Sequence, residues 1–248
     1  MLGGVFHLDP IPHLMRQYVA EQDVVLRRTA ENLSAAVARL KQGDRDRFAQ
    51  LVDVVRSLPE YDVRFLDIGK GSFGEVMLAL KERKGRTSVT VPARQMSDGM
   101  LRMLAIATAL LTGGGGLAID TSAGSRAGAL MLVIEELENG LHPSQAGKLL
   151  QLVKRASADQ GFQVVLTTHS PALLNALAGD DHSGVVVIER ERTSGHSTAR
   201  RLVDLPGYLR LMASSRLGDA ISAGRLAEAS EQPPALPDDE LDRLLGIA

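Results

Sequence analysis

The sequence predicts an α/β fold in which helices flank a parallel sheet and an antiparallel hairpin is attached. Continuous apolar runs at residues 130–134, 162–166 and 185–188 are typical of strands buried on both faces. Expected helices at 143–155 and 171–177 separate these runs, and this alternation implies parallel pairing with right-handed crossovers. Near period-2 alternation at residues 76–80, followed by the turn Lys84-Gly85-Arg86, predicts the hairpin.

The first 60 residues predict a short strand and then helices. An apolar segment at residues 5–8 stops at Asp9-Pro10, and apolar residues then recur at helical spacing in two segments, around 33–40 and 48–55. Asn32 and Asp44 are the expected N-caps of these two helices. Residues 61–92 predict strands that include the hairpin.

A third long helix is expected from Asp98 to Leu111, ended by the four glycines 113–116. We therefore expect one main domain at residues 1–222, with a helical segment at 1–60, a strand hairpin at 61–92 and a core at 93–222. The remaining residues, 223–248, are rich in Ala, Glu and Pro and predict a loosely attached tail.

Composition excludes several classes of protein. The chain has no cysteine, which excludes disulfides and zinc–cysteine sites. No apolar run is long enough for a membrane span and the N-terminus is unlike a signal peptide, so we expect a cytoplasmic protein. The net charge of −2 gives no support for nucleic acid as a partner. A local basic group is best interpreted as a solvated surface; it comprises Arg190, Arg192, Arg200 and Arg201.

Two adjacent acids follow the apolar run at 130–134. Glu135 and Glu136 stand at the carboxyl end of an expected buried strand, where open α/β sheets bind ligands. One carboxylate can hold Mg²⁺, directly or through water, and the other can orient or deprotonate an attacking water. Taken alone, the pair could equally be two acids that face solvent.

Thr167-Thr168-His169-Ser170-Pro171 follows the next apolar run, which places His169 at the end of a neighbouring strand and near the acidic pair. An imidazole there can donate to a phosphate oxygen and respond to nearby charge. Other histidines lack this context and are interpreted as surface or packing residues; they include His7, His13, His182 and His196.

Ser97-Asp98-Gly99-Met100-Leu101-Arg102 opens the long helix. The unpaired N–H groups and positive dipole end of a helix N-terminus can bind an anion, and Gly99 would let a phosphate approach closely. Helix capping by Ser97 or Asp98 explains the same string without any ligand.

The three motifs, in this order, resemble the second half of an ABC/SMC-like ATPase, close to the predicted AAA-type ATPases related to overcoming-lysogenization and DNA-repair ATPases. The resemblance implies a P-loop NTPase-like fold, with ATP and Mg²⁺ as substrate and cofactor. It implies Glu136 as general base, Glu135 as the Mg²⁺ residue and His169 as the γ-phosphate contact. It further implies a head-to-tail dimer, in which one subunit's helix start grips the other subunit's nucleotide through Ser97, Asp98, Gly99 and Arg102.

The sequence departs from this family at two positions and lacks one motif. Glu135 stands where Asp is commoner, and Asp98 places a carboxylate beside an expected triphosphate. The phosphate-binding (Walker A) string G-x-x-x-x-G-K-[ST] does not occur in the chain, so the N-terminal lobe is expected to be missing. Two glycine-rich segments do not replace it: residues 69–76 predict a β-turn and residues 113–116 a connector.

Three explanations for the missing loop stay open: an N-terminal truncation, half of a split ATPase completed by a Walker A-bearing partner chain, or a degenerate relative. The last would be a non-catalytic interaction module rather than an enzyme. The segment Glu138–Pro143 lies where such ATPases contact a partner subunit, and His142 fits either a partner contact or a local cap.

Overall fold

The computed structural model describes residues 2–58, 61–119, 129–161, 163–190 and 195–231. The chain divides into two compact units, Met1–His169 and Ser170–Ala248, a division different from the expected boundary at residue 222. The first unit contains β1 (Leu2–Leu8), α1 (Pro12–Met15), β2 (Val19–Ala20), α2 (Leu33–Gly43), α3 (Arg45–Arg56), β3 (Val63–Lys70), β4 (Glu75–Lys84), β5 (Thr87–Pro92), α4 (Asp98–Thr112), β6 (Ala129–Ile134), α5 (Ala146–Gln160) and β7 (Gln163–Leu166).

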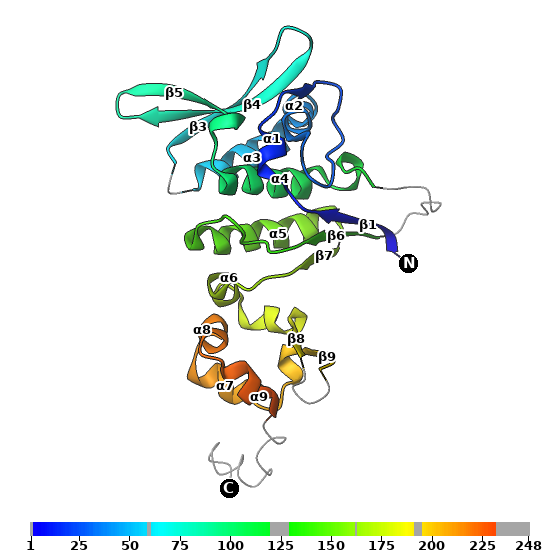
Figure 1. Cartoon of the computed structure of the whole chain (residues 1–248), viewed down its shortest axis with the longest axis vertical. Helices are drawn as coiled ribbons and strands as arrows, with labels where there is room; N and C mark the ends of the chain where they lie inside the picture. Colours follow the sequence, from blue (N-terminus) through cyan, green and yellow to red (C-terminus); the bar gives the residue numbers. More distant parts are fainter. Residues whose placement is uncertain (1, 59–60, 120–128, 162, 191–194, 232–248) are drawn as a thin grey trace. The chain divides into compact units, whose positions relative to one another are not determined.

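A three-stranded parallel sheet in the order β1-β6-β7 is the element that positions the acidic motif (Figure 1). The predicted parallel pairing of the runs at 130–134 and 162–166 is confirmed, and the N-terminal strand adds to the other edge of β6. Leu132 and Ile134 on β6 are fully buried, whereas Val165 on the edge strand β7 is 42% exposed. The expectation that both runs are buried on both faces is therefore wrong for β7.

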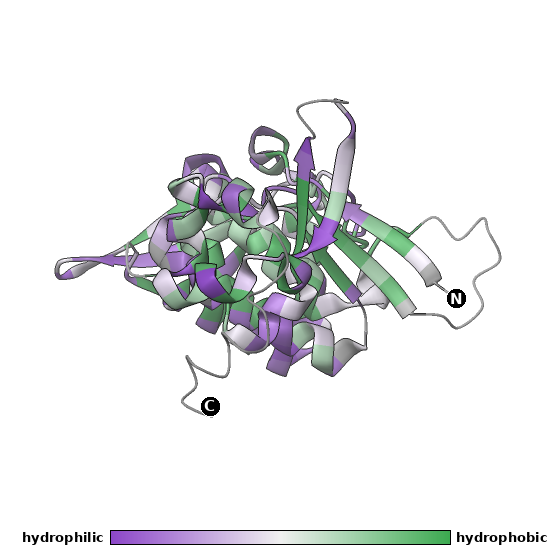
Figure 2. Cartoon of the chain, turned by 90° about the horizontal axis from the view of Figure 1, so that it is seen from below, coloured by the Kyte–Doolittle hydropathy of each residue, from purple (hydrophilic) through white to green (hydrophobic). Residues whose placement is uncertain are grey.

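The antiparallel part of the unit is a second sheet, in which β4 pairs with β2, β3 and β5. The turn at Lys84-Gly85-Arg86 is confirmed, because Lys84 pairs with Thr87 and Gly85 has φ +61°. Residues 71–74 form the turn between β3 and β4, as expected of the glycine-rich segment. Figure 2 shows that the outer end of the β4–β5 ribbon is hydrophilic, whereas the middle of β4 is apolar and packs on α2.

Helix α4 is the centre of the first unit. Almost every residue from Met100 to Leu111 is buried, which is the pattern of a helix enclosed on all sides. It contacts α2, α3 and α5. Ser97 caps its start, and Gly113, with φ +62°, ends it. Because so much apolar area is buried around α4, the position of its first turn is fixed by the core.

The second unit contains α6 (Pro171–Asn175), β8 (Val186–Arg190), β9 (Ser197–Arg201), α7 (Tyr208–Ser214), α8 (Leu217–Ser222) and α9 (Arg225–Glu231). Its core includes Leu174, Leu202, Leu205 and Leu217. Residues 225–231, expected in a loosely attached tail, instead form α9, and Ala229 packs with Leu211 and Ala220.

The third apolar run, at 185–188, was expected to join the parallel sheet, and this expectation is wrong. Strand β8 pairs in antiparallel fashion with β9 in a separate two-stranded sheet. Val186 is 55% exposed and Ile188 is 72% exposed. A run of β-branched residues specifies a strand but not its partner, and here the partner is the next strand along the chain.

Asn32 and Asp44, the two predicted N-caps, have different roles in the structure. The Asp44 carboxylate accepts the Arg47 N–H at 3.0 Å, which confirms the predicted cap. Asn32 makes no side-chain cap. Its side chain is buried and ties down the preceding loop: it accepts the Arg27 N–H and donates to the carbonyls of Asp23 and Val25.

We predict that Asn32→Ala lowers the free energy of unfolding by about 1–3 kcal/mol, because buried backbone groups of the loop lose their partners. Urea unfolding followed by circular dichroism measures this difference. The matched control is Gln50→Ala on the exposed side of α3. Equal unfolding midpoints for the two variants would contradict the role of Asn32.

Candidate active site

The acidic loop, defined here as Glu135–Gly140, leaves the carboxyl end of β6. Glu136 has φ +45°, a left-handed conformation that is uncommon for a residue with a long side chain. Its N–H donates to the Thr167 hydroxyl at 3.0 Å, and the Asn139 amide donates to its carboxylate at 3.3 Å. Strain of this kind persists only where surrounding contacts enforce it, and it concentrates at functional sites.

Glu135 lies beside a residue that the sequence did not single out. The Nε2 atom of His7 on β1 is 3.0 Å from a carboxylate oxygen of Glu135, whose side chain is largely exposed. The sequence analysis interpreted His7 as a surface or packing residue, and the structure adds that it contacts Glu135. The parallel register pairs His7 with Val133 near the end of both strands, which brings the imidazole to the acidic pair. The contact could have been predicted from sequence only if the N-terminal strand had been paired with the strand that precedes Glu135.

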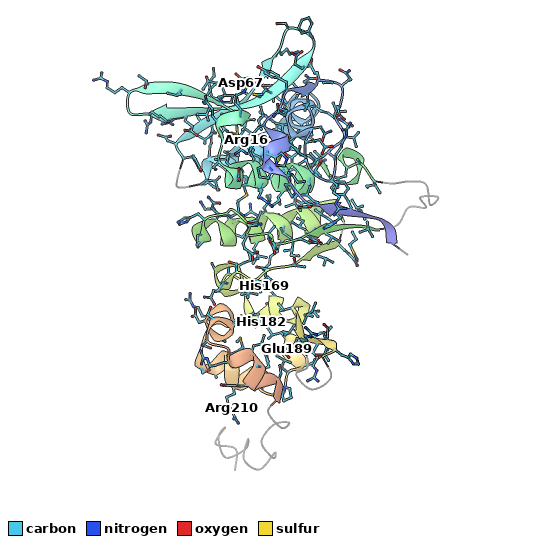
Figure 3. All side chains as sticks on the ribbon, in the orientation of Figure 1. Arg16, Asp67, His169, His182, Glu189 and Arg210 are labelled. Atoms are coloured by element: carbon cyan, nitrogen blue, oxygen red, sulfur yellow. The ribbon has the colours of Figure 1, made fainter. Side chains whose placement is uncertain are left out.

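The His loop, defined here as Thr167–His169, follows β7 and is joined to the acidic loop by several hydrogen bonds. Thr167 donates its N–H to Ile134 and accepts the N–H of Leu137. One carboxylate oxygen of Glu138 accepts the Thr168 hydroxyl at 2.7 Å, and the other accepts the His169 N–H at 2.8 Å. The structure thus brings His169, which is exposed and labelled in Figure 3, next to the acidic loop as predicted.

The signature segment, Ser97–Arg102, forms the first turn of α4. The Ser97 hydroxyl accepts the Met100 N–H at 3.1 Å and lies 2.8 Å from the Tyr61 hydroxyl. Arg16 forms an ion pair with Asp98 at 2.6 Å and also donates to the Met96 carbonyl. The Asp98 carboxylate, which departs from the expected motif, is therefore paired with the Arg16 guanidinium of this chain. The ion pair is too exposed to stabilise the fold strongly.

Gly99 has a structural role that the sequence analysis did not predict. A Cβ atom added there would lie 2.0 Å from the carbonyl oxygen of Gly140, so no other residue fits without movement of the backbone. Gly140 itself has φ +76°, and the Arg102 side chain runs close to it. The space beside the Gly99 Cα, where a phosphate was expected to approach, is thus filled by the acidic loop. The acidic loop and the signature segment touch at this point.

These contacts form one continuous site within the first unit. The acidic loop touches the signature segment through Gly99 and Gly140, and the His loop through Glu138. All the residues expected to serve the chemistry lie in these three segments; they are Ser97, Asp98, Gly99, Arg102, Glu135, Glu136 and His169. The contact residues that sequence reasoning missed are His7, Arg16, Tyr61 and Glu138.

Glu135 and Glu136 offer the oxygen atoms that Mg²⁺ prefers, and Mg²⁺ often takes only one or two carboxylates from the protein and the remainder from phosphate and water. Within the described ranges, no group of three or more His, Asp or Glu side chains is arranged to hold a metal ion by itself. Glu135 and Glu136 thus offer carboxylate oxygens but do not form a complete metal site by themselves.

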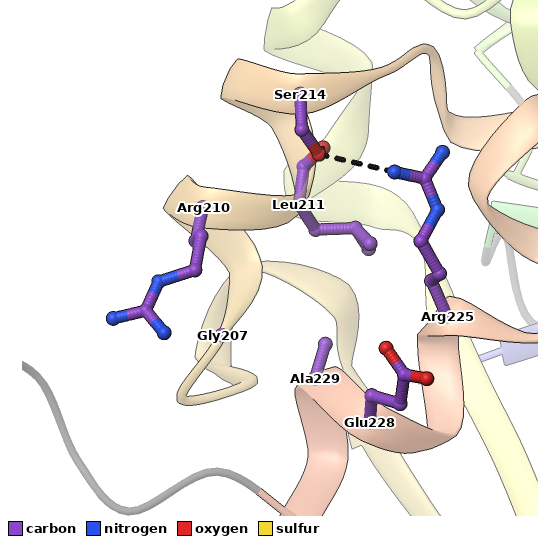
Figure 4. A pocket seen from close by; sticks show the side chains of 7 residues that line it. All are labelled: Gly207, Arg210, Leu211, Ser214, Arg225, Glu228 and Ala229. Carbon is purple, nitrogen blue, oxygen red and sulfur yellow. Dashed lines mark hydrogen bonds between the residues drawn. The ribbon is translucent and has the colours of Figure 1, made fainter.

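Features elsewhere do not compete with this site. A small hollow of about 90 Å³ lies between α7 and α9, where Arg225 donates to the Ser214 hydroxyl (Figure 4). His182 is a packing residue, as expected, and its Nδ1 lies 3.0 Å from the Tyr208 hydroxyl.

In the basic group, the hydrogen bond from Arg201 to Asp204 raises the pKa of Arg201, and Arg190 donates to the Gly195 carbonyl. Arg192 lies outside the described residues.

We predict that Gly99→Ala lowers the free energy of unfolding by about 1–3 kcal/mol, because its methyl group forces α4 and the acidic loop apart. The control is Gly43→Ala, where an added Cβ meets nothing within 4 Å. Thermal unfolding of both variants measures the difference. A Gly99→Ala protein as stable as the Gly43→Ala protein would show that the backbone contact is not maintained.

We predict that Glu136→Gly raises the free energy of unfolding by up to about 1 kcal/mol, because glycine adopts positive φ without the strain that Glu136 bears. Glu135→Gly is the matched control: Glu135 does not have positive φ, so glycine there only adds flexibility and should destabilise. If Glu136→Gly destabilises as much as Glu135→Gly, the strain at Glu136 is refuted.

None of the helices in the described part of the chain combines the length and apolar character that a membrane span requires. No curated protein matches the sequence. Several solved structures are similar to this chain at low sequence identity. A chain from a study of ATP-driven dimerization and DNA-stimulated activation of SMC ATPases has a TM-score of 0.44 and 10% identity, over 72% of this chain and 96% of that one.

Two further similar structures are heads of Smc proteins. One, bound to the C-winged helix domain of ScpA, has a TM-score of 0.46 and 12% identity, over 81% of this chain and 55% of that one. The other, from Pyrococcus furiosus, has an extended coiled coil and is bound to the C-terminal domain of ScpA; its TM-score is 0.42 and its identity 12%, over 75% of this chain and 42% of that one. This chain therefore spans about half the length of these two chains.

The family comparison covers the three motif segments of the candidate site but not His7. The model of a family described as "AAA domain, putative AbiEii toxin, Type IV TA system" matches residues 9–175, well over half of the chain. The matched region begins directly after β1 and ends with α6, so it includes the signature segment, the acidic loop and the His loop. The chain belongs to this family of AAA domains.

Proposed function

We propose that this chain contributes the hydrolytic half of an ABC/SMC-like ATPase site. The AAA family assignment supports nucleotide binding and hydrolysis in general terms. The observation that carries the proposal is the conformation of Glu136: a carboxylate on a strained backbone, fixed at its N–H by Thr167 and at its side chain by Asn139. An exposed carboxylate held in this way is suited to orient and deprotonate a water molecule.

The other residues divide the remaining tasks. Glu135, next to His7, supplies oxygen atoms for Mg²⁺. When bound, Mg²⁺ neutralises charge on the phosphates and helps to align them for attack. His169 has its backbone fixed by Glu138 and donates from its imidazole to the γ-phosphate. The start of α4, at Ser97 and Asp98, binds the nucleotide held by another subunit in a head-to-tail dimer, whereas Gly99 packs on the acidic loop.

The string G-x-x-x-x-G-K-[ST] does not occur in these 248 residues, so the proposed ATPase site requires a phosphate-binding loop from another segment. Either a segment upstream of Met1 or a separate partner chain supplies it. In the described part of the chain β7 pairs only with β6, which leaves a sheet edge available for one more strand. Sequencing the DNA directly upstream of the Met1 codon and in adjacent reading frames distinguishes these two sources.

We predict that the chain alone has negligible ATP turnover and gains it when the phosphate-loop segment is fused or co-expressed. In this restored protein, Glu136→Gln keeps nucleotide binding and lowers kcat by about 10²–10⁴-fold, because the general base is lost. Fluorescent-nucleotide titration measures binding, and phosphate release measures turnover.

Glu82→Gln on β4, the same substitution outside the site, is the matched control and should leave both quantities unchanged. Normal turnover by the Glu136→Gln protein would refute the assignment of the base. A restored protein that neither binds nor hydrolyses ATP would favour the alternative, a non-catalytic interaction module.

A further inference from the structure

Glu138 is the residue that joins the acidic loop to His169. Its two carboxylate oxygens are used separately: one accepts the Thr168 hydroxyl at 2.7 Å, the other the His169 N–H at 2.8 Å. Glu138 is partly buried, unlike Glu135 and Glu136, which are exposed. A carboxylate that is turned inward and accepts two hydrogen bonds is not presented to a ligand.

The hydrogen bonds of Thr167 do not duplicate this connection. They fix Ile134, Glu136 and Leu137, which belong to the end of β6 and the start of the acidic loop. The two hydrogen bonds of Glu138 run from the acidic loop to Thr168 and His169. Thr167 therefore sets the path of the acidic loop, and Glu138 sets where the His loop stands against it.

The position of Glu138 along the chain adds a second constraint. Two residues before it is Glu136, and two residues after it is Gly140, whose backbone is packed against Gly99 of α4. Glu138 thus lies between the candidate base and the contact with the signature segment. Any displacement of this residue would move His169 relative to both, and hydrogen bonds to an ionised acceptor are strong enough to resist it.

We propose that Glu138 is a positioning residue that holds His169 at a fixed place relative to Glu136, so that both side chains address the same phosphate. The proposal rests on the proposed ATPase function and assigns the site a residue without direct contact with nucleotide. It predicts a specific defect: a chain with a displaced His169 still binds nucleotide, but the reacting groups are misaligned.

The first test uses the full chain without nucleotide. Glu138→Gln keeps the size of the side chain, but an amide cannot use both of its terminal atoms as acceptors. We expect the ¹H–¹⁵N resonance of the His169 amide to shift and its hydrogen exchange to accelerate, with an unchanged melting temperature. Glu82→Gln is the matched control and should leave this resonance unchanged. An unaltered His169 amide in Glu138→Gln would overturn the proposal.

The second test uses the ATPase restored with its phosphate-loop segment. We expect Glu138→Gln to lower kcat by about 100-fold with little change in KM for ATP. Glu138→Asp, which retains both acceptor oxygens, should recover part of kcat, and this variant also serves if Glu138→Gln fails to fold. An active parent with a fully active Glu138→Gln variant would refute positioning while the ATPase assignment stands. An inactive parent would refute the ATPase assignment, and the amide measurement would still decide the role of Glu138 in placing His169.

Discussion

The parallel pairing of β6 with β7 is the constraint on which the candidate site depends. Both strands run in the same direction and end at Ile134 and Leu166, which are partners in the register, so the loops that follow them must leave from adjacent points. Thr167 then donates to Ile134 and accepts from Leu137, which extends the pairing by one step beyond the strands. The acidic loop and the His loop are therefore held together before any ligand is considered.

Backbone geometry, more than side-chain charge, determines the shape of this site. Glu136 and Gly140 both have positive φ, and Gly99 and Gly140 are too close to admit a Cβ atom between them. The acidic loop accordingly makes two sharp changes of direction within six residues. These turn it first toward β7 and then toward α4, so that one short loop contacts both other motifs.

The parts of the fold that the sequence predicted are those governed by local rules. The Asp44 cap, the Lys84-Gly85-Arg86 turn and the strand at 130–134 each depend on residues close in sequence, and each is confirmed. Of the two candidate caps of α4, Ser97 and Asp98, the structure has Ser97. The errors concern which partner a strand or side chain takes, because the residue pattern of that segment does not specify the partner. The run at 185–188 pairs with β9 instead of the parallel sheet, and the Asn32 side chain serves a loop instead of its helix.

The same distinction applies to the candidate site. The residues that we propose to react were predicted from sequence because Glu135 and Glu136 directly follow one apolar strand and His169 lies shortly after the next. Their supporting contacts could not be predicted, because each links separate segments: His7 to Glu135, Arg16 to Asp98 and Tyr61 to Ser97. Glu138 is intermediate, since it belongs to a recognisable motif but its partners lie 30 and 31 residues away. A motif therefore indicates which chemistry is possible, whereas its long-range hydrogen bonds determine its geometry.

This arrangement also separates two requirements of phosphoryl transfer. Holding a nucleotide requires the phosphate-binding loop, which the 248 residues do not contain. Aligning a general base with a side chain that donates a hydrogen bond to the γ-phosphate requires only that the loops after two parallel strands be fixed to each other. Here Thr167 and Glu138 fix them with hydrogen bonds from this chain alone. If the chain forms the ATPase site that we propose, these hydrogen bonds place Glu136 and His169 before nucleotide binds, so that little further reorganisation is needed.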